Sequence, residues 1–162
     1  MTTGQQMDPQ TLERILQVRN IETIDASRLV ELFREEGQMS SSLPDGTHQV
    51  DPRNGDRILY NASRARRPHD YHPPDVPQGS AKECAICQGR TTGVVDAATL
   101  SEGFTFINKN LFPVLYPHDP EAHLAHGLHF LQWTSSLHDL DWYNMPPDDL
   151  AIVMARLAAL EK

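Results

Sequence analysis

The chain has 162 residues, a formal net charge of −8 and ordinary apolar and charged fractions, so it is long enough for one globular domain with a core. No apolar run reaches the roughly 18 residues of a membrane span and no signal-peptide core is present, which predicts a cytoplasmic protein without membrane contact. The acidic balance disfavours nucleic acid as a partner, because that role needs basic surfaces that displace counterions from phosphates.

Two short helices are predicted between residues 8 and 37. The first begins at Asp8-Pro9 and the second at Asp25, where an acidic side chain can cap free N–H groups and proline suits a first turn. A stretch rich in Ser, Pro and Gly follows these helices. We therefore interpret residues 1–45 as a helical extension with a linker.

Residues 46–162 form the predicted main domain, in which short β-strands replace the helical pattern. Alternation of apolar and polar side chains is typical of half-buried strands, and turns rich in Asp, Pro and Gly separate them. The predicted extended segments are Arg57–Tyr60, Phe104–Ile107, Phe112–Pro117 and Gly127–Thr134. The proline-rich stretch from Arg67 to Ser80 is predicted to be irregular surface chain.

A final helix is predicted to begin at Pro146-Pro147. Asp148 and Asp149 fall in its first turn, where carboxylates favour the positive end of the helix dipole. Its apolar stripe consists of Leu150, Val153, Met154, Leu157 and Leu160 and continues to the last residues. We expect this helix to pack against further protein. Together the elements predict an α+β fold with an antiparallel sheet and flanking helices.

The only two cysteines form the motif Cys84-Ala-Ile-Cys87. Two thiolates at this spacing can bind one zinc ion, which takes four ligands in a tetrahedron. Gly89 and Gly93 follow closely and predict a tight turn. A redox dithiol and two free buried thiols are the alternatives; a redox site would favour a helix starting at the first cysteine within a βαβ pattern, which is absent here.

His138 is the candidate third zinc ligand, 51 residues after Cys87. It follows a predicted strand, which can hold the imidazole in place, and Asp139 beside it could orient the second ring nitrogen. The alternative is an ordinary surface or core histidine. Most other histidines lie in loops rich in Pro or Asp and are expected to face solvent.

A local basic surface is predicted on the acidic body of the protein. It consists of Arg53, Arg57, Arg64, Arg66 and Arg67. Guanidinium groups bind phosphates in a bidentate manner, which favours a phosphate or nucleotide contact, although a solvated run of charges is the simpler alternative. Asn110-Leu-Phe-Pro113 adds an amide and an aromatic ring that could contact a base, or could simply form a turn.

The order of these motifs resembles the N-terminal half of the galactose-1-phosphate uridylyltransferase family, in the histidine-triad superfamily. The matching blocks are Asp51-Pro-Arg-x-Gly-Asp56, Arg64-Ala-Arg-Arg67-Pro68, Cys84-x-x-Cys87, Asn110-x-Phe-Pro113 and Gly127-x-His129 with His138 nine residues later. The resemblance covers about residues 49 to 162 and leaves the N-terminal helices outside it. It implies a histidine-triad-like antiparallel sheet and a possible homodimer.

This resemblance also implies the roles of individual residues. Cys84, Cys87 and His138 would be zinc ligands in a mainly structural site, with the fourth ligand a histidine near or within a catalytic His-Pro-His segment. Arg64, Arg67 and Asn110 would lie by the nucleotide. The implied substrates are nucleotide sugars and sugar phosphates of galactose metabolism. A histidine would attack the α-phosphate and pass the nucleotidyl group to a second sugar phosphate.

The chain departs from this family at the nucleophile, because it contains no His-Pro-His-x-Gln segment. His123, His126 and His129 lack that context and are interpreted as incidental. No catalytic residue is therefore assigned. We expect the 162 residues to be an inactive N-terminal part of a longer enzyme. A nucleotide-sugar phosphorylase of the same fold and a non-enzymatic zinc-binding module are the alternative functions.

Overall fold

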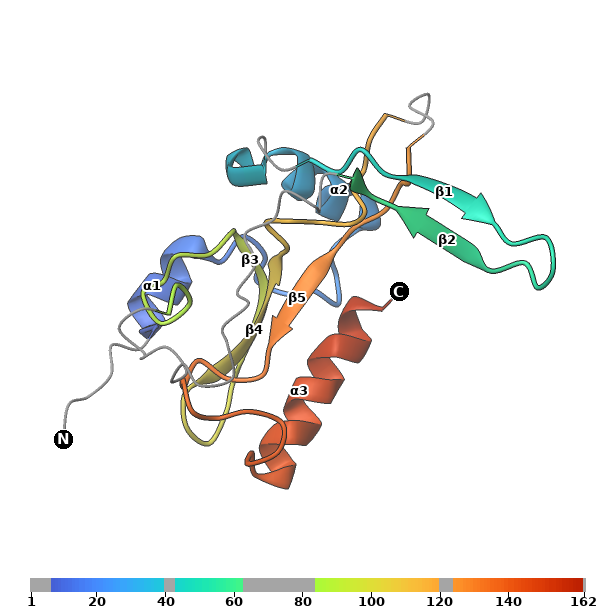
Figure 1. The fold of residues 1–162 in the computed structure, drawn as a ribbon. Helices are drawn as coiled ribbons and strands as arrows, with labels where there is room; N and C mark the ends of the chain where they lie inside the picture. Colours follow the sequence, from blue (N-terminus) through green and yellow to red (C-terminus); the bar gives the residue numbers. More distant parts are fainter. Residues whose placement is uncertain (1–6, 40–42, 63–83, 120–123, 162) are drawn as a thin grey trace, which may run out of the picture.

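The computed structural model describes residues 7–39, 43–62, 84–119 and 124–161 (Figure 1). In these residues it contains three α-helices and two small antiparallel sheets, which confirms the predicted α+β class. The helices are α1 (Pro9–Ile15), α2 (Ala26–Arg34) and α3 (Pro147–Leu160), and a 3-10 helix, η1, spans Gly37–Met39. None of the helices in the described ranges has the length and apolar character that a membrane crossing requires.

The larger sheet has three antiparallel strands. In spatial order they are β3 (Val94–Thr99), β4 (Phe104–Lys109) and β5 (Phe130–Trp133). Every residue of the central strand β4 is buried, as expected for a strand covered on both faces. Ile107 of β4 lies opposite Gln132 of β5 in the register. The turn between β3 and β4 uses Gly103 at φ +71°, a conformation that favours glycine.

Apolar clusters cover both faces of this sheet. One cluster joins Val95 and Ile107 to Val18, Ile21, Leu29 and Leu32. The cluster on the other face joins Val94, Phe104 and Phe106 to Met7, with Leu12, Ile15 and Leu16 packed against it. Side chains on adjacent residues of a strand point to opposite faces, which explains how Val94 and Val95 enter different clusters. The segment from residue 7 to residue 39 therefore contributes to the core on both sides of the sheet.

A buried lysine connects the N-terminal segment to the central strand. The side chain of Lys109 is fully buried, and its ammonium group lies 2.7 Å from a carboxylate oxygen of Glu36. It also donates hydrogen bonds to Gln17 Oε1 at 2.8 Å and to the Leu32 carbonyl at 2.9 Å. A buried charge is tolerated when it is paired and hydrogen-bonded, and this arrangement meets both conditions.

Helix α3 is attached to β3 by a second charged contact. Arg156 of α3 donates from Nε and Nη2 to the two carboxylate oxygens of Asp96, at 2.8 and 2.7 Å, and from Nη1 to Glu22 at 3.0 Å. At the other end of the helix, Asp149 is buried and accepts hydrogen bonds from the backbone and hydroxyl of Ser101. These contacts fix both ends of α3 against the sheet (Figure 1).

The smaller sheet is a hairpin that projects from the body (Figure 1). It consists of β1 (Thr47–Val50) and β2 (Arg57–Tyr60), and all eight of these residues are exposed. The turn between the strands contains Gly55 at φ +80°, with open space where a Cβ would lie. The hairpin therefore adds little to the core.

Capping residues and prolines in the sequence predicted the helix starts better than the alternation of apolar and polar residues predicted the strands. Asp8 caps α1 by accepting a hydrogen bond from the Thr11 amide at 2.7 Å, and α3 begins at Pro147 as predicted. Strands β1 and β3 were not predicted, and β5 is shorter than the predicted Gly127–Thr134. The predicted extended segment Phe112–Pro117 forms only an isolated bridge between Tyr116 and His126.

Candidate metal centre

The two cysteines lie on a compact turn that brings both thiols to one side. The Gln88 amide donates to the Cys84 carbonyl at 3.1 Å, and two further backbone hydrogen bonds close the turn over residues 85–90. Residues three apart on such a helical turn are neighbours. Gly89 ends the turn at φ +67°, in the left-handed region that favours glycine. The sequence therefore folds locally into a bidentate thiol site.

His138 arrives from the loop that follows β5. Ser136 anchors this loop to the start of β4, because its amide donates to the Phe104 carbonyl at 2.7 Å and its hydroxyl accepts from the Phe104 amide at 3.1 Å. The hydroxyl of Ser135 accepts from the Leu137 amide at 3.0 Å. Ser135 and Ser136 are buried, so they hold the backbone immediately before His138.

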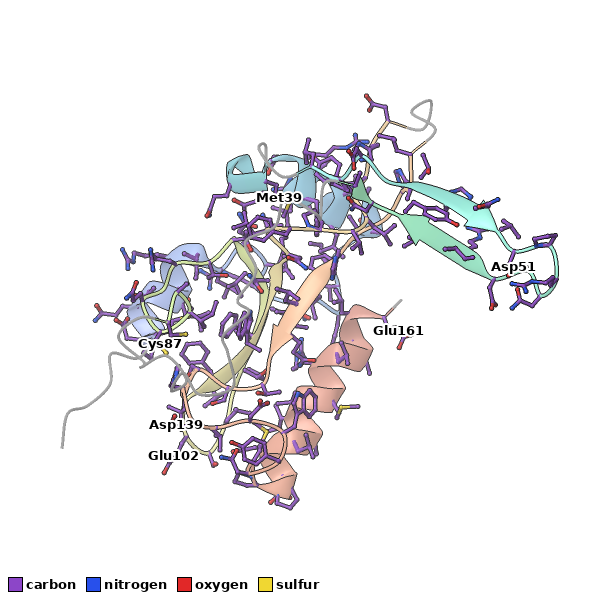
Figure 2. All side chains as sticks on the ribbon, viewed as in Figure 1. Met39, Asp51, Cys87, Glu102, Asp139 and Glu161 are labelled. Carbon is purple, nitrogen blue, oxygen red and sulfur yellow. The ribbon has the colours of Figure 1, made fainter. Side chains whose placement is uncertain are left out.

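The structure brings Cys84, Cys87 and His138 together. Their ligand atoms all lie within 4.8 Å of one another, and Cys87 Sγ is 3.3 Å from His138 Nδ1. Zinc binds sulfur at about 2.3 Å and nitrogen at about 2.0 Å, so tetrahedral geometry separates the two by roughly 3.5 Å. Cys87 lies beside α1, and the loop that carries Asp139 reaches it from the sheet (Figure 2). The three residues are close enough to bind one metal ion.

The two thiols differ in acidity without a metal ion. Burial opposes ionisation of Cys84, but hydrogen bonds from the backbone and side chain of Cys87 outweigh it and lower the pKa of Cys84. Burial and the neighbouring Cys84 raise the pKa of Cys87 to about 11. The first thiolate therefore forms on Cys84. A bound divalent cation would favour both thiolates, because a coordinating thiol is deprotonated.

A cavity of about 390 Å³ lies beside the three candidate ligands. The residues that line it include Cys84, Cys87, Trp133, His138, Asp141 and Trp142. Among the described residues, no fourth histidine, cysteine or carboxylate joins the cluster. The cavity has room for a further ligand group beside these three side chains.

Of the predicted nucleotide-binding residues the structure describes Asn110, which is not among the residues that line the cavity beside the three candidate ligands. Arg64 and Arg67 lie outside the described residues. Asn110 is buried at the end of β4, where its Oδ1 accepts from the Phe112 amide at 2.9 Å and its Nδ2 lies 3.2 Å from His129 Nε2. Its amide thus stabilises the local turn. Asn110 hydrogen-bonds to His129, directly before β5, whereas His138 follows the end of that strand.

Two supporting contacts at the centre have no clear signal in the sequence. Ser136 holds the His138 loop, and Thr11 of α1 contacts Gly89 at the end of the cysteine turn. Serine and threonine are common loop and helix residues, so only their positions in the fold reveal these roles.

Comparisons with protein-family models, with curated proteins and with solved structures found no match to this chain.

Proposed function

We propose that Cys84, Cys87 and His138 bind zinc. Two thiolates and one imidazole form a donor set that suits zinc, and their ligand atoms all lie within 4.8 Å of one another, close enough for a single ion. The thiols come from one turn and the imidazole from a loop 51 residues later, so the ion would connect two parts of the fold. In this role the metal is structural.

We further propose that these residues are the N-terminal, zinc-binding part of a nucleotidyltransferase of the UDP-glucose–hexose-1-phosphate uridylyltransferase type. The convergence of Cys84, Cys87 and His138 carries this proposal, because they are the three residues that the family resemblance assigns to zinc. The antiparallel sheet that leads to His138 supports a histidine-triad-like fold.

In the proposed reaction, a nucleotidyl group passes between sugar phosphates through a histidine nucleophile. Arg64 and Arg67 would neutralise phosphate charge, and Asn110 would keep the nearby loop in place for the base. The 162 residues contain no His-Pro-His segment to supply the nucleophile. This chain alone is therefore expected to bind the nucleotide without transferring it.

Metal content tests the zinc centre. Purified protein should hold about one zinc ion per chain, and the double variant Cys84→Ser, Cys87→Ser should lose it with two ligands gone. His138→Ala removes the third proposed ligand and should also lower the zinc content. Its control is His126→Ala, because His126 is exposed and lies outside the cluster. Stoichiometric zinc in the double cysteine variant would contradict the assignment.

Nucleotide binding tests the proposed enzyme class. Calorimetric titration with UDP should show binding that weakens in Arg64→Ala, Arg67→Ala but not in Arg19→Ala, which removes an exposed arginine elsewhere. Phosphorus NMR with UDP-glucose and a sugar phosphate should show no transfer. Zinc binding without UDP binding would instead favour a zinc-binding module. Breakdown of UDP-glucose with inorganic phosphate would favour a phosphorylase.

A further inference from the structure

Helix α1 lies directly against the turn that carries the cysteines (Figure 1). The contact is closest between Gly89 and Thr11, where a Cβ built on Gly89 would lie 2.5 Å from Thr11 Cγ2. Real Cβ atoms do not approach other heavy atoms so closely, so the absence of a side chain at Gly89 allows the turn to reach the helix. The cysteine turn therefore rests on α1.

Two further contacts connect the N-terminal segment to the chain around the cysteines. Ile86, between the two cysteines, packs against the apolar cluster that also contains Met7 and receives Leu12 of α1. After the turn, the Gln17 amide donates to the Val94 carbonyl at 2.8 Å. The stretch from Ile86 to Val94 is thus held by the N-terminal segment at both of its ends and, through Gly89, between them.

The imidazole of the centre is held by a different part of the protein. His138 follows β5, and the hydrogen bonds between Ser136 and Phe104 fix its loop to the sheet. The distance between the thiols and the imidazole therefore depends on how the N-terminal segment sits on the sheet. Metal binding is sensitive to such a distance, because ligand positions must fit the ion within about 0.2 Å.

We propose that α1 is a positioning element of the metal centre and that the contact between Thr11 and Gly89 sets the place of the two thiols. This inference rests on the proposed zinc site. Coupling between two sites is reciprocal, so zinc binding must also stabilise α1. A helix of seven residues has little stability of its own, which makes the effect measurable.

Hydrogen exchange of the unaltered protein gives the first test. Addition of zinc to metal-free protein should slow amide exchange in the cysteine turn and in α1. The β1–β2 hairpin is the internal control, because it projects from the body and shares no cluster with the centre. Unchanged exchange of the α1 amides at saturating zinc would overturn the proposal.

A set of three variants gives the second test. Gly89→Ala places a methyl group against Thr11 and should weaken zinc binding by about 10- to 100-fold, the usual effect of losing support behind a metal ligand. Gly55→Ala controls for a general loss of stability, because it also places a side chain at positive φ but has open space around it and lies in the hairpin away from the centre (Figure 1). Thr11→Ser removes the methyl group that clashes and should restore part of the affinity in the Gly89→Ala background.

Zinc affinity is measured by competition with a chromophoric chelator, and absorption of the cobalt-substituted protein reports the thiolate ligands. Weakening by Gly89→Ala alone, with partial rescue by Thr11→Ser, supports the positioning role. No rescue by Thr11→Ser would show that backbone strain at Gly89, and not the contact with Thr11, weakens zinc binding, and would overturn the proposal. Absence of zinc from the unaltered protein would remove the metal centre itself.

Discussion

Lys109 shows how one residue can hold two parts of a chain together. Lysine is almost never fully buried unless it is paired, because removing its charge from water is costly. In this protein the ammonium group has a carboxylate and two further oxygens as partners, all from the segment before residue 37. Its contribution lies in fixing one arrangement of the N-terminal segment on the sheet.

We expect Glu36→Gln to destabilise the protein by about 3–5 kcal/mol, because it leaves the Lys109 ammonium group buried without its counter-charge. The control is Glu13→Gln, which breaks an exposed pair with Arg19 and should change stability by less than about 1 kcal/mol. Urea unfolding measures both variants. Equal losses of stability would show that Lys109 is solvated in solution.

Individual residue types revealed the candidate metal ligands in the sequence but not the contacts that hold them in place. Cysteine and histidine have side-chain chemistry that suits zinc wherever the fold places them. Thr11, Gly89 and Ser136 act through packing and backbone hydrogen bonds between segments that are far apart in the chain. A single sequence carries no signal for such contacts, so the positioning of the site could not be predicted.

At the scale of elements, the first turn of α3 contains two aspartates with different roles. Both were predicted to favour the helix dipole, yet Asp148 is exposed and Asp149 is buried against Ser101. Asp149 therefore also ties the helix to the turn between β3 and β4. The different roles of Asp148 and Asp149 appear only in the folded protein, where the turn between β3 and β4 lies against the helix.

Asp149→Asn should cost about 1–3 kcal/mol, since the hydrogen bonds that Ser101 donates to the buried carboxylate lose its negative charge. Asp148→Asn changes the same charge in the same turn and should cost only about 0.3–1 kcal/mol through the dipole. Thermal unfolding of the two variants at neutral pH measures the difference. Similar melting temperatures would mean that the Ser101 contact contributes nothing.

The elements that were predicted correctly have strong local signals, and those that were missed do not. Proline identifies the starts of α1 and α3 within a few residues, together with the Asp8 cap of α1 and the acidic first turn of α3. β3 contains Asp96, a charged residue that breaks the apolar pattern expected of a buried strand. It is buried because Arg156, 60 residues later, neutralises it. Such a partner cannot be found from the strand alone.

The stability of the whole molecule should depend on pH through Glu36. Burial alone would raise the pKa of Glu36, but hydrogen bonds from Lys109 and the Gly93 amide, with the attraction of the Lys109 charge, outweigh it and lower that pKa. A lowered carboxyl pKa stabilises the folded state above the unfolded-state pKa of about 4.3. This stabilisation is lost as the pH falls through the folded-state pKa.

We therefore expect the stability difference between the unaltered protein and Glu36→Gln to be largest above about pH 5 and to shrink on acidification. Urea unfolding from pH 7 to pH 3 measures it. A stability difference that stays constant from pH 7 to pH 3 would show that Glu36 has the same pKa in the folded and unfolded chains.

The network around Lys109 also has a consequence for the order in which the protein can fold. Gln17 and Lys109 are 92 residues apart in the chain. At synthesis rates of about 5–20 residues per second, roughly 5–18 s pass between the appearance of the two residues. During this interval α2 has no sheet to cover, and its apolar face is available to chaperones. The segment from residue 7 to residue 39 must wait for β4 before it can pack on the sheet.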